Sequence, residues 1–315
     1  MSFFELVDGS DASLHRFLNS LPGVDQIGAQ SRAAMLATRS VKTHSKNWAI
    51  NLAISMVDLT TLEGSDTPGK IRALCSKAVR PDPTDSTVPH VGAVCVYNDM
   101  VDVARKHLDL IGGSDVPVAA VTTAFPSGRA SITVKIQDTQ DAINAGATEI
   151  DMVIDRGAFL SGRYGQVFDQ ILQIRQLCGK KARLKVILET GELVTYDNVR
   201  KASYLAMLAG ADFIKTSTGK VSPAATPPVV LVMLEAVRDF YTMTQRRIGV
   251  KPAGGIRNTK DAIRQLVLVN EIAGPEWLSP ALFRIGASAL LNDLLMQRMK
   301  MRDGYYPNST YVTID

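Results

Sequence analysis

Short apolar runs alternate along the chain with longer segments in which apolar residues recur at helical spacing. Several runs are almost wholly apolar, as expected for strands of a parallel sheet that are covered on both faces. They recur roughly 30 residues apart, the length of one strand and its crossover helix. The sequence predicts strands at residues 54–59, 91–97, 116–123, 149–154, 184–189, 212–216, 248–251 and 283–286.

The segments between these strands carry helix boundary signals. Side chains of Thr, Asp and Asn cap helix N-termini, and glycine commonly follows the last helical residue. The predicted boundaries are Asp138 with Asp141 and Gly146 for one helix, Thr195 and Gly210 for the next, Thr226 before Pro227 for a third, and Asn258 with Asp261 for a fourth.

Eight strand–helix units in series favour an α/β fold, a closed (β/α)8 TIM barrel. Eight strands close with an interior that side chains can fill. A doubly wound open sheet is the alternative. It is less favoured because no Gly-x-Gly-x-x-Gly motif follows the first strand.

The two ends of the chain lie outside this repeat. We expect an N-terminal helical extension at residues 1–47, the barrel at 48–300 and a mobile C-terminal tail at 301–315. The extension should hold short helices near 14–21 and 32–38, packed on the barrel exterior. A partner-binding or regulatory arm is the alternative. The tail contains Tyr305, Tyr306 and Tyr311.

Composition narrows the class of protein. The 315 residues are 46% hydrophobic and 21% charged, with a net charge of +4, which excludes a disordered chain. Without a basic cluster, that charge predicts no nucleic-acid surface, although it suits an anionic small substrate. Apolar runs are too short for a membrane span of about 18 residues. Cys75, Cys95 and Cys178 lack metal-site or disulfide spacing, so we expect no metal and a cytoplasmic protein.

Three ionisable residues lie where a barrel carries its chemistry, at or near the C-terminal ends of strands. Lys215 ends the predicted sixth strand, Lys251 ends the seventh, and Asp151 lies in the fourth. A lysine in an apolar strand needs a partner in the barrel mouth or must reach solvent. Two lysines on adjacent strands, with an aspartate in the same barrel, therefore predict a catalytic cluster.

The lysine pair suggests a particular chemistry. Two partly desolvated ammonium groups disfavour each other's charge, which lowers the pKa of one of them from the ordinary value of about 10.4. The resulting neutral amine can attack a carbonyl and form a Schiff base. A protonated imine withdraws electrons from the adjacent carbon–carbon bond, as an aldolase without a metal requires.

Glycine segments after the last strands predict a phosphate site. In barrels this site uses the loops after strands seven and eight and a helix N-terminus. Gly254 and Gly255 follow the seventh predicted strand, and Gly286 and Ser288 lie at the eighth, where we expect the last helix to open. Residues after strand six that could close the cradle are Thr218, Gly219 and Lys220.

Over about residues 48–300 the chain resembles the deoxyribose-phosphate aldolase family. The matching stretches, in order, are VDLTTL (57–62), VGAVCVYNDMV (91–101), EIDMVID (149–155), LKVILETGEL (184–193), DFIKTSTG (212–219), VKPAGGIR (250–257) and RIGASALL (284–291). The pair FIKTSTG and KPAGGIR is specific to this family among barrel enzymes.

The resemblance implies a (β/α)8 enzyme with neither metal nor cofactor, which could form a homodimer. It would cleave 2-deoxy-D-ribose 5-phosphate reversibly to D-glyceraldehyde 3-phosphate and acetaldehyde. The matching positions make Lys215 the Schiff-base lysine, Lys251 the lysine that keeps it neutral, and Asp151 a proton shuttle acting through water. Asp58 and Thr216 would lie at the rim of the site, and the other matches are the phosphate contacts Gly254, Gly255 and Ser288.

Two positions depart from the family pattern. Many members have a second serine where this chain has Ala289, so one hydroxyl contact to phosphate is absent. Some members end in a tyrosine that reaches the site, whereas this chain ends Ile314-Asp315.

Two rival functions stay open. A phosphosugar isomerase on the same fold would use Glu189 as its base, although Glu189 could equally pair with Lys185 or a mouth lysine. A catalytically silent barrel could instead serve as an interaction protein through its extension. The retained lysine pair argues against such a role.

Overall fold

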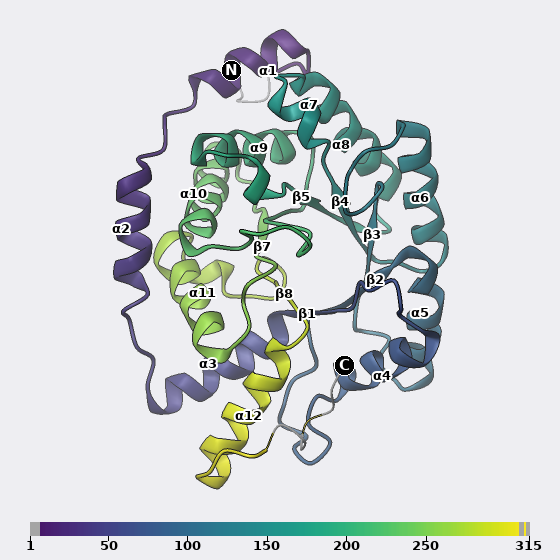
Figure 1. Ribbon diagram of the computed structural model, residues 1–315, viewed down its shortest axis with the longest axis vertical. Helices are drawn as coiled ribbons and strands as arrows, with labels where there is room; N and C mark the ends of the chain where they lie inside the picture. The colour runs from purple at the N-terminus through teal and green to yellow at the C-terminus, as the bar shows by residue number, and fades with distance from the viewer. Residues whose placement is uncertain (1–6, 309–311, 313–315) are drawn as a thin grey trace.

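A computed structural model describes residues 7–308 and residue 312. Eight parallel strands stand at the centre, with helices around them (Figure 1). The strands are β1 (Val57–Thr60), β2 (Ala93–Tyr97), β3 (Val118–Thr122), β4 (Glu149–Val153), β5 (Arg183–Ile187), β6 (Phe213–Lys215), β7 (Gly249–Lys251) and β8 (Ile285–Ala287).

The sheet closes into the predicted barrel. Its strand order is β7-β6-β5-β4-β3-β2-β1-β8, so each strand pairs with its sequence neighbour and β8 pairs with β1. Two parallel bridges, Val250 with Phe283 and Ala253 with Gly286, join β7 to the segment around β8. Every strand therefore points its C-terminal end toward the same mouth.

Helices follow the strands around the outside. They are α3 (Thr43–Met56), α4 (Pro68–Val79), α5 (Val101–Leu110), α6 (Ile132–Asn144), α7 (Arg156–Leu160), α8 (Tyr164–Cys178), α9 (Tyr196–Leu208), α10 (Pro227–Thr244), α11 (Thr259–Ile272) and α12 (Leu290–Asp303). Short 3-10 turns are η2 (Asn98–Met100), η3 (Thr190–Glu192) and η4 (Pro275–Trp277).

Within the described chain, no helix is both long and apolar enough to span a bilayer.

Three of the four predicted helix starts are confirmed and one is wrong. Thr195, Thr226 and Asn258 are the N-caps of α9, α10 and α11. Asp138 lies inside α6, which begins after the N-cap Ser131. The carboxylate of Asp138 accepts hydrogen bonds from the backbone N–H of Thr123, after β3, and from the side-chain amide of Asn98, after β2. It therefore anchors loops instead of a helix end.

The first predicted strand begins too early. Residues 54–56 are the last turn of α3, which runs directly into β1 at Val57. Ala49, Ile50, Ala53 and Ile54 are buried at helical spacing along α3. A helix that buries an apolar face leaves the same short apolar run as a buried strand.

The chain before α3 forms α1 (Asp11–Ser20) and α2 (Gln26–Leu36) on the outside of the barrel (Figure 1). Helix α1 packs on α8 and α9, and α2 packs on α10. Arg32 of α2 donates to Glu235 of α10 at 2.6 Å, and Arg200 of α9 reaches the same carboxylate. Helix α3 runs without interruption through residues 47 and 48. The division between extension and barrel at 47/48 stays a prediction.

Candidate active site

The three predicted catalytic residues meet inside the barrel. Lys215 and Lys251 are register partners at the ends of β6 and β7, so their side chains project to the same side. Both ammonium nitrogens lie 2.8 Å from the Oδ2 atom of Asp151 on β4. All three side chains are buried, with exposed fractions of 2% or less. One carboxylate oxygen therefore bridges the two lysines.

The two lysines differ in their pKa. Burial lowers the pKa of Lys215, and the neighbouring charge of Lys251 lowers it further, against the opposing pull of Asp151. Burial also disfavours the charge of Lys251, but Asp151 and Asp58 outweigh burial and hold its pKa well above the ordinary value. Lys215 is thus the amine that most readily loses its proton.

The causes of the lowered pKa of Lys215 differ from those that the sequence predicts. The sequence predicts that the like charge of Lys251 is the main cause. In the structure burial is the larger cause and Lys251 the smaller one. The ammonium of Lys251 stays charged because it has two carboxylates, Asp151 at 2.8 Å and Asp58 at 2.6 Å.

Asp151 is held ionised by three lysines. Burial opposes its charge, but Lys185, Lys215 and Lys251 together hold its pKa well below the ordinary value. Lys185 of β5 donates to its other oxygen, Oδ1, at 3.0 Å. Such a carboxylate is a weak base. It can relay a proton or face a cation, but it does not keep a proton near neutral pH.

Asp58 does not lie at the rim as predicted. It is fully buried in β1, where Arg284 donates to its Oδ1 at 2.6 Å and Lys251 lies 2.6 Å from its Oδ2. Burial opposes its ionisation, but Lys251, Lys185 and Arg284 lower its pKa. Asp58 therefore supports Lys251 from inside the barrel and is not placed to touch a substrate at the mouth.

Thr216 is also buried and not at the rim. Its hydroxyl accepts from the backbone N–H of Ala253 at 2.9 Å and donates to the carbonyl of Ala253 at 3.1 Å. The neighbouring Ser217 hydroxyl donates to the same carbonyl. Thr216 thus ties the end of β6 to the segment after β7, which sets Lys215 and Lys251 side by side.

We expect Thr216→Val to lower the free energy of unfolding by about 1–3 kcal/mol, because two backbone groups of Ala253 lose a buried partner. Thermal unfolding measures the loss. Thr216→Ser keeps the hydroxyl and should recover most of it. A loss confined to Thr216→Ser, with Thr216→Val as stable as the wild type, would show that packing of the methyl group, not the hydrogen bonds, matters at this position.

Glu189 is engaged by the loop after β6 and not by a lysine. Its carboxylate accepts from the Thr218 hydroxyl at 2.5 Å and from the Thr218 backbone N–H at 3.3 Å. Burial raises its pKa. Neither predicted partner, Lys185 or a mouth lysine, contacts it; Lys185 pairs with Glu149 and Asp151 instead. The arrangement gives Glu189 and Thr218 a structural task in shaping the loop.

The predicted phosphate segments converge beside the lysines. Gly254 and Gly255 follow β7 with φ of 82° and 85°, a conformation that favours glycine. A side chain at Gly254 would come within 3.5 Å of Gly219 in the loop after β6. The bridge between Ala253 and Gly286 brings β8 against the same turn. Loops after strands six, seven and eight therefore share one corner of the mouth.

One detail at β8 differs from the prediction. Gly286 belongs to β8, as the predicted strand implies, but the last helix opens only at Leu290, with Ala289 as an N-cap that provides no side-chain hydrogen bond. A Cβ at Gly286 would lie 2.8 Å from the Cβ of Ala253 and 3.2 Å from the Lys251 Cε atom. Gly286 therefore makes room for Lys251, while exposed Ser288 lies between β8 and the helix.

Lys220 also has a partner. Its ammonium lies 2.9 Å from the carboxylate of Glu63, in the loop after β1, and both side chains are partly exposed. This exposed pair bridges two loops and contributes little to stability.

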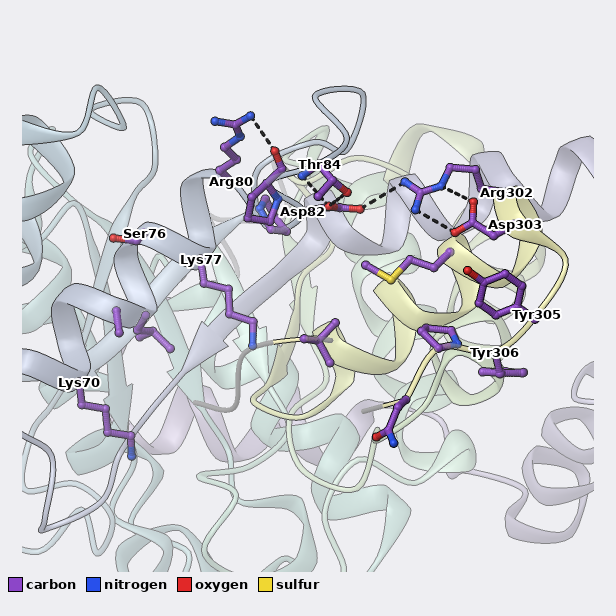
Figure 2. Close-up of a pocket in the computed structure, with 18 of the residues that line it drawn as sticks. Lys70, Ser76, Lys77, Arg80, Asp82, Thr84, Arg302, Asp303, Tyr305 and Tyr306 are labelled. Carbon is purple, nitrogen blue, oxygen red and sulfur yellow. Dashed lines mark hydrogen bonds and ion pairs between the residues drawn. The ribbon is translucent and has the colours of Figure 1, made fainter. Parts of the chain in front are cut away.

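A large groove among the described residues lies away from the lysines of the barrel interior. A groove of about 1320 Å³ runs between α4 and the end of α12, and its lining includes Lys70, Lys77, Arg302, Tyr305 and Tyr306 (Figure 2). Arg302 pairs with neighbouring Asp303 at 2.8 Å and with Asp82 at 3.8 Å (Figure 2). None of the lysines in the barrel interior lines this groove.

The predicted tail is partly helical, because α12 extends to Asp303. The Lys300 ammonium lies 4.4 Å from the centre of the Tyr306 ring. Tyr311 lies outside the described residues.

Lys185 and Arg284 belong to the interior cluster but were missed as site residues. Lys185 sits in the apolar stretch LKVILE, so it carried the same signal as Lys215 and Lys251. Arg284 precedes β8 by one residue, and no sequence pattern aims it into the barrel. Among the described residues, no group of three or more His, Cys, Asp or Glu side chains is arranged to hold a metal ion.

Known proteins resemble this chain in sequence and in fold. The model of the DeoC/LacD family of aldolases matches residues 52–295. The deoxyribose-phosphate aldolase of Homo sapiens is 47% identical over 269 residues, covering 83% of this chain and 84% of the relative. The enzyme of Mus musculus is 46% identical over the same shares of both chains.

Solved structures share the barrel. The aldolase QR15 superposes with a TM-score of 0.61 at 29% identity, covering 78% of this chain and 97% of that one. The deoxyribose phosphate aldolase of Aeropyrum pernix, described as a tetramer, has a TM-score of 0.60 at 24% identity, covering 84% of this chain and all of that one. The latter likeness shows the fold. By its sequence relatives and family model, the chain belongs to the DeoC/LacD family of aldolases.

Proposed function

We propose that this aldolase cleaves 2-deoxy-D-ribose 5-phosphate to D-glyceraldehyde 3-phosphate and acetaldehyde through a Schiff base on Lys215. The observation that carries the proposal is the buried Lys215 amine, 2.8 Å from a carboxylate that it shares with Lys251. The curated relatives at 46–47% identity are named for this phosphosugar.

Lys215 begins the reaction as a neutral amine. Its lone pair attacks the C1 aldehyde of the open-chain sugar, and the carbinolamine loses water to give a protonated imine. Because burial and Lys251 lower the pKa of Lys215, a larger fraction of this amine is neutral near pH 7 than of an ordinary lysine. The cation of the imine then occupies the place of the ammonium, beside the carboxylate of Asp151.

The imine draws electrons from the C2–C3 bond. As the C3 hydroxyl loses its proton, that bond breaks, glyceraldehyde 3-phosphate leaves, and its bonding electrons form an enamine on Lys215. Protonation of the enamine at C2 and hydrolysis by water then release acetaldehyde and the free amine. We assign Asp151, acting through a water molecule, to relay these protons, because its low pKa prevents it from storing one.

The mouth corner formed by the three loops is the proposed phosphate site. Left-handed backbone at Gly219, Gly254 and Gly255 exposes peptide N–H groups, and the N-terminus of the α12 helix favours an anion. Ser288 adds a hydroxyl at this helix end, where Ala289 adds none. Lys220 contributes positive charge while it bridges to Glu63.

We expect Ser288→Asp to raise KM for deoxyribose 5-phosphate about 100-fold, because it sets a carboxylate against the phosphate. Cleavage of unphosphorylated 2-deoxyribose should stay unchanged. Ser288 is exposed and precedes a helix, so an aspartate is tolerated there. Ser288→Asn is the matched neutral control. An unchanged KM in Ser288→Asp would move the phosphate to another part of the mouth.

Acetaldehyde release from deoxyribose 5-phosphate, measured in the presence of a metal chelator, tests the function itself. We expect sustained release at the same rate with and without the chelator. Isomerisation of the sugar without acetaldehyde would overturn the proposal in favour of the isomerase. If the protein shows neither aldol cleavage nor isomerisation, the proposal fails and the hypothesis of a catalytically silent interaction protein remains. The homodimer and the cytoplasmic location remain predictions.

A further inference from the structure

Two buried charged residues lie below the proposed site and have no part in the reaction described above. Glu149 of β4 and Arg284, just before β8, are 2% and 3% exposed. The Arg284 guanidinium lies 2.6 Å from Asp58 and 3.0 Å from Glu149. Burying a charged side chain is costly, and more so when it has no charged partner. Their presence inside the barrel therefore calls for an explanation.

These contacts close a ring of alternating charges. Arg284 contacts Asp58, Asp58 contacts Lys251, and Lys251 contacts Asp151. From Asp151 the ring returns through Lys185 and Glu149 to Arg284. Around the ring, carboxylates and cations alternate, and Lys185 also lies 3.5 Å from Asp58 across it.

The ring is neutral by itself, because it contains three cations and three carboxylates. Lys215 lies outside it and reaches Asp151, whose two oxygens already serve Lys185 and Lys251. When every group of this described cluster is ionised, Lys215 supplies the one surplus positive charge. Loss of its proton restores neutrality.

We propose that Glu149 and Arg284 are positioning residues of the aldolase. They complete a neutral ring of charges in which Lys185 and Lys251 already pair with both oxygens of Asp151, so that Lys215 is the surplus cation. This inference rests on the proposed function of Lys215. Glu149 and Arg284 do not contact Lys215, so they would act on its charge only through the other members of the ring.

The packing around Arg284 supports a fixed placement. Its side chain runs past Gly92, at the start of the segment leading into β2. A Cβ at Gly92 would lie 3.1 Å from the Arg284 Cδ atom and 2.8 Å from the carbonyl of Ser55. Arg284 also donates from Nε to the carbonyl of Pro280. All three donor nitrogens of the guanidinium are thus held by fixed acceptors.

Removing one charge from the ring should move the titration of Lys215 in a known direction. Arg284→Met removes a cation, so the cluster is neutral with Lys215 protonated and the amine keeps its proton. Glu149→Gln removes a carboxylate, so the surplus becomes two charges and the proton is lost more easily. The double variant restores the original surplus.

The charged and titratable groups that face Lys215 directly stay in place in all three variants. They are Asp151 from β4, Lys251 from β7 and the buried Cys95 thiol from β2. Differences among the variants therefore report Glu149 and Arg284, two ring residues that do not contact the amine.

The experiment compares pH profiles of kcat/KM for deoxyribose 5-phosphate in these variants. We expect the acidic limb of Arg284→Met to move up by about one pH unit and that of Glu149→Gln to move down by a similar amount, as for a single buried charge. The limb of Glu149→Gln/Arg284→Met should return to the wild-type position. Arg284→Lys keeps the charge, so its limb should stay while its rate falls.

A merely structural role predicts lower rates with unmoved limbs in Arg284→Met and Glu149→Gln, and that result would overturn the inference. Thermal unfolding checks each variant. If Arg284→Met does not fold, the test rests on the isosteric Glu149→Gln, whose acidic limb should move to lower pH. Borohydride labelling of wild-type Lys215 distinguishes failure of the ring proposal from failure of the proposed function. If Lys215 is labelled but the acidic limbs do not move, the ring proposal is refuted. If Lys215 is not labelled, the proposed function is refuted.

Discussion

We expect Lys215→Ala to lower the rate of aldol cleavage by on the order of 10⁵-fold, because the variant has no amine to form the Schiff base. The side chain is buried and ends β6, so no exposed lysine can take its place. Borohydride added with deoxyribose 5-phosphate should reduce the imine and leave a covalent adduct. Mass spectrometry of the digested wild-type protein should find that adduct on Lys215.

Lys106→Ala is the matched control for this labelling. Lys106 is an exposed lysine on α5 that pairs with Asp102 at the i−4 position. Its removal should change neither rate nor labelling. Undiminished substrate-dependent labelling in Lys215→Ala would place the imine on another lysine and defeat the assignment.

The second large effect is expected for Lys251→Leu, which should lower kcat about 100–1,000-fold near pH 7. Loss of Lys251 removes a like charge from the vicinity of Lys215 and frees Asp151 from a competing cation. Both changes raise the pKa of Lys215, so a smaller fraction of the amine is neutral. Below the pKa, each tenfold loss of neutral amine costs tenfold in rate.

The sign of this shift gives a direct check in the pH profile. Activity of Lys251→Leu should recover as the pH rises toward the ordinary lysine pKa of about 10.4, because a growing fraction of the Lys215 amine is then neutral. Lys251→Arg keeps the positive charge and should keep the acidic limb near that of the wild type. A loss in Lys251→Leu that is the same at every pH would mean that Lys251 acts in another step.

The fold was predictable from sequence because strands buried on both faces leave apolar runs at regular spacing. The element boundaries were less so. Residues 54–56 are helical although their apolar pattern suits a strand, because α3 buries its own apolar face before β1 begins. Asp138 resembles a helix cap but binds the Thr123 backbone from inside α6, a tertiary contact with no local signal.

The site was predictable where a charge interrupts an apolar strand. Lys215, Lys251 and Asp151 carry that signal, and their side chains do meet. Asp58 and Thr216 were placed at the rim by resemblance alone, and both are buried in pairing roles. Depth along a barrel depends on strand register, which a single sequence does not specify.

The balance of forces on Lys215 was not accessible from sequence either. Two lysines on adjacent strands indicate mutual repulsion, whereas the amount of burial depends on every side chain that fills the barrel. In the structure burial is the larger cause of the lowered pKa of Lys215. Pairing with Asp58 explains why Lys251, at the same depth, keeps its proton.

Direct titration of the two lysine amines in the wild-type protein tests this central claim. NMR with ¹³C label at the lysine Cε positions, assigned through Lys215→Arg and Lys251→Arg, follows each amine as the pH changes. We predict that Lys215 titrates below the ordinary lysine value and that Lys251 titrates above it. Titration of Lys215 at or above that value, or of Lys251 before Lys215, would contradict the account.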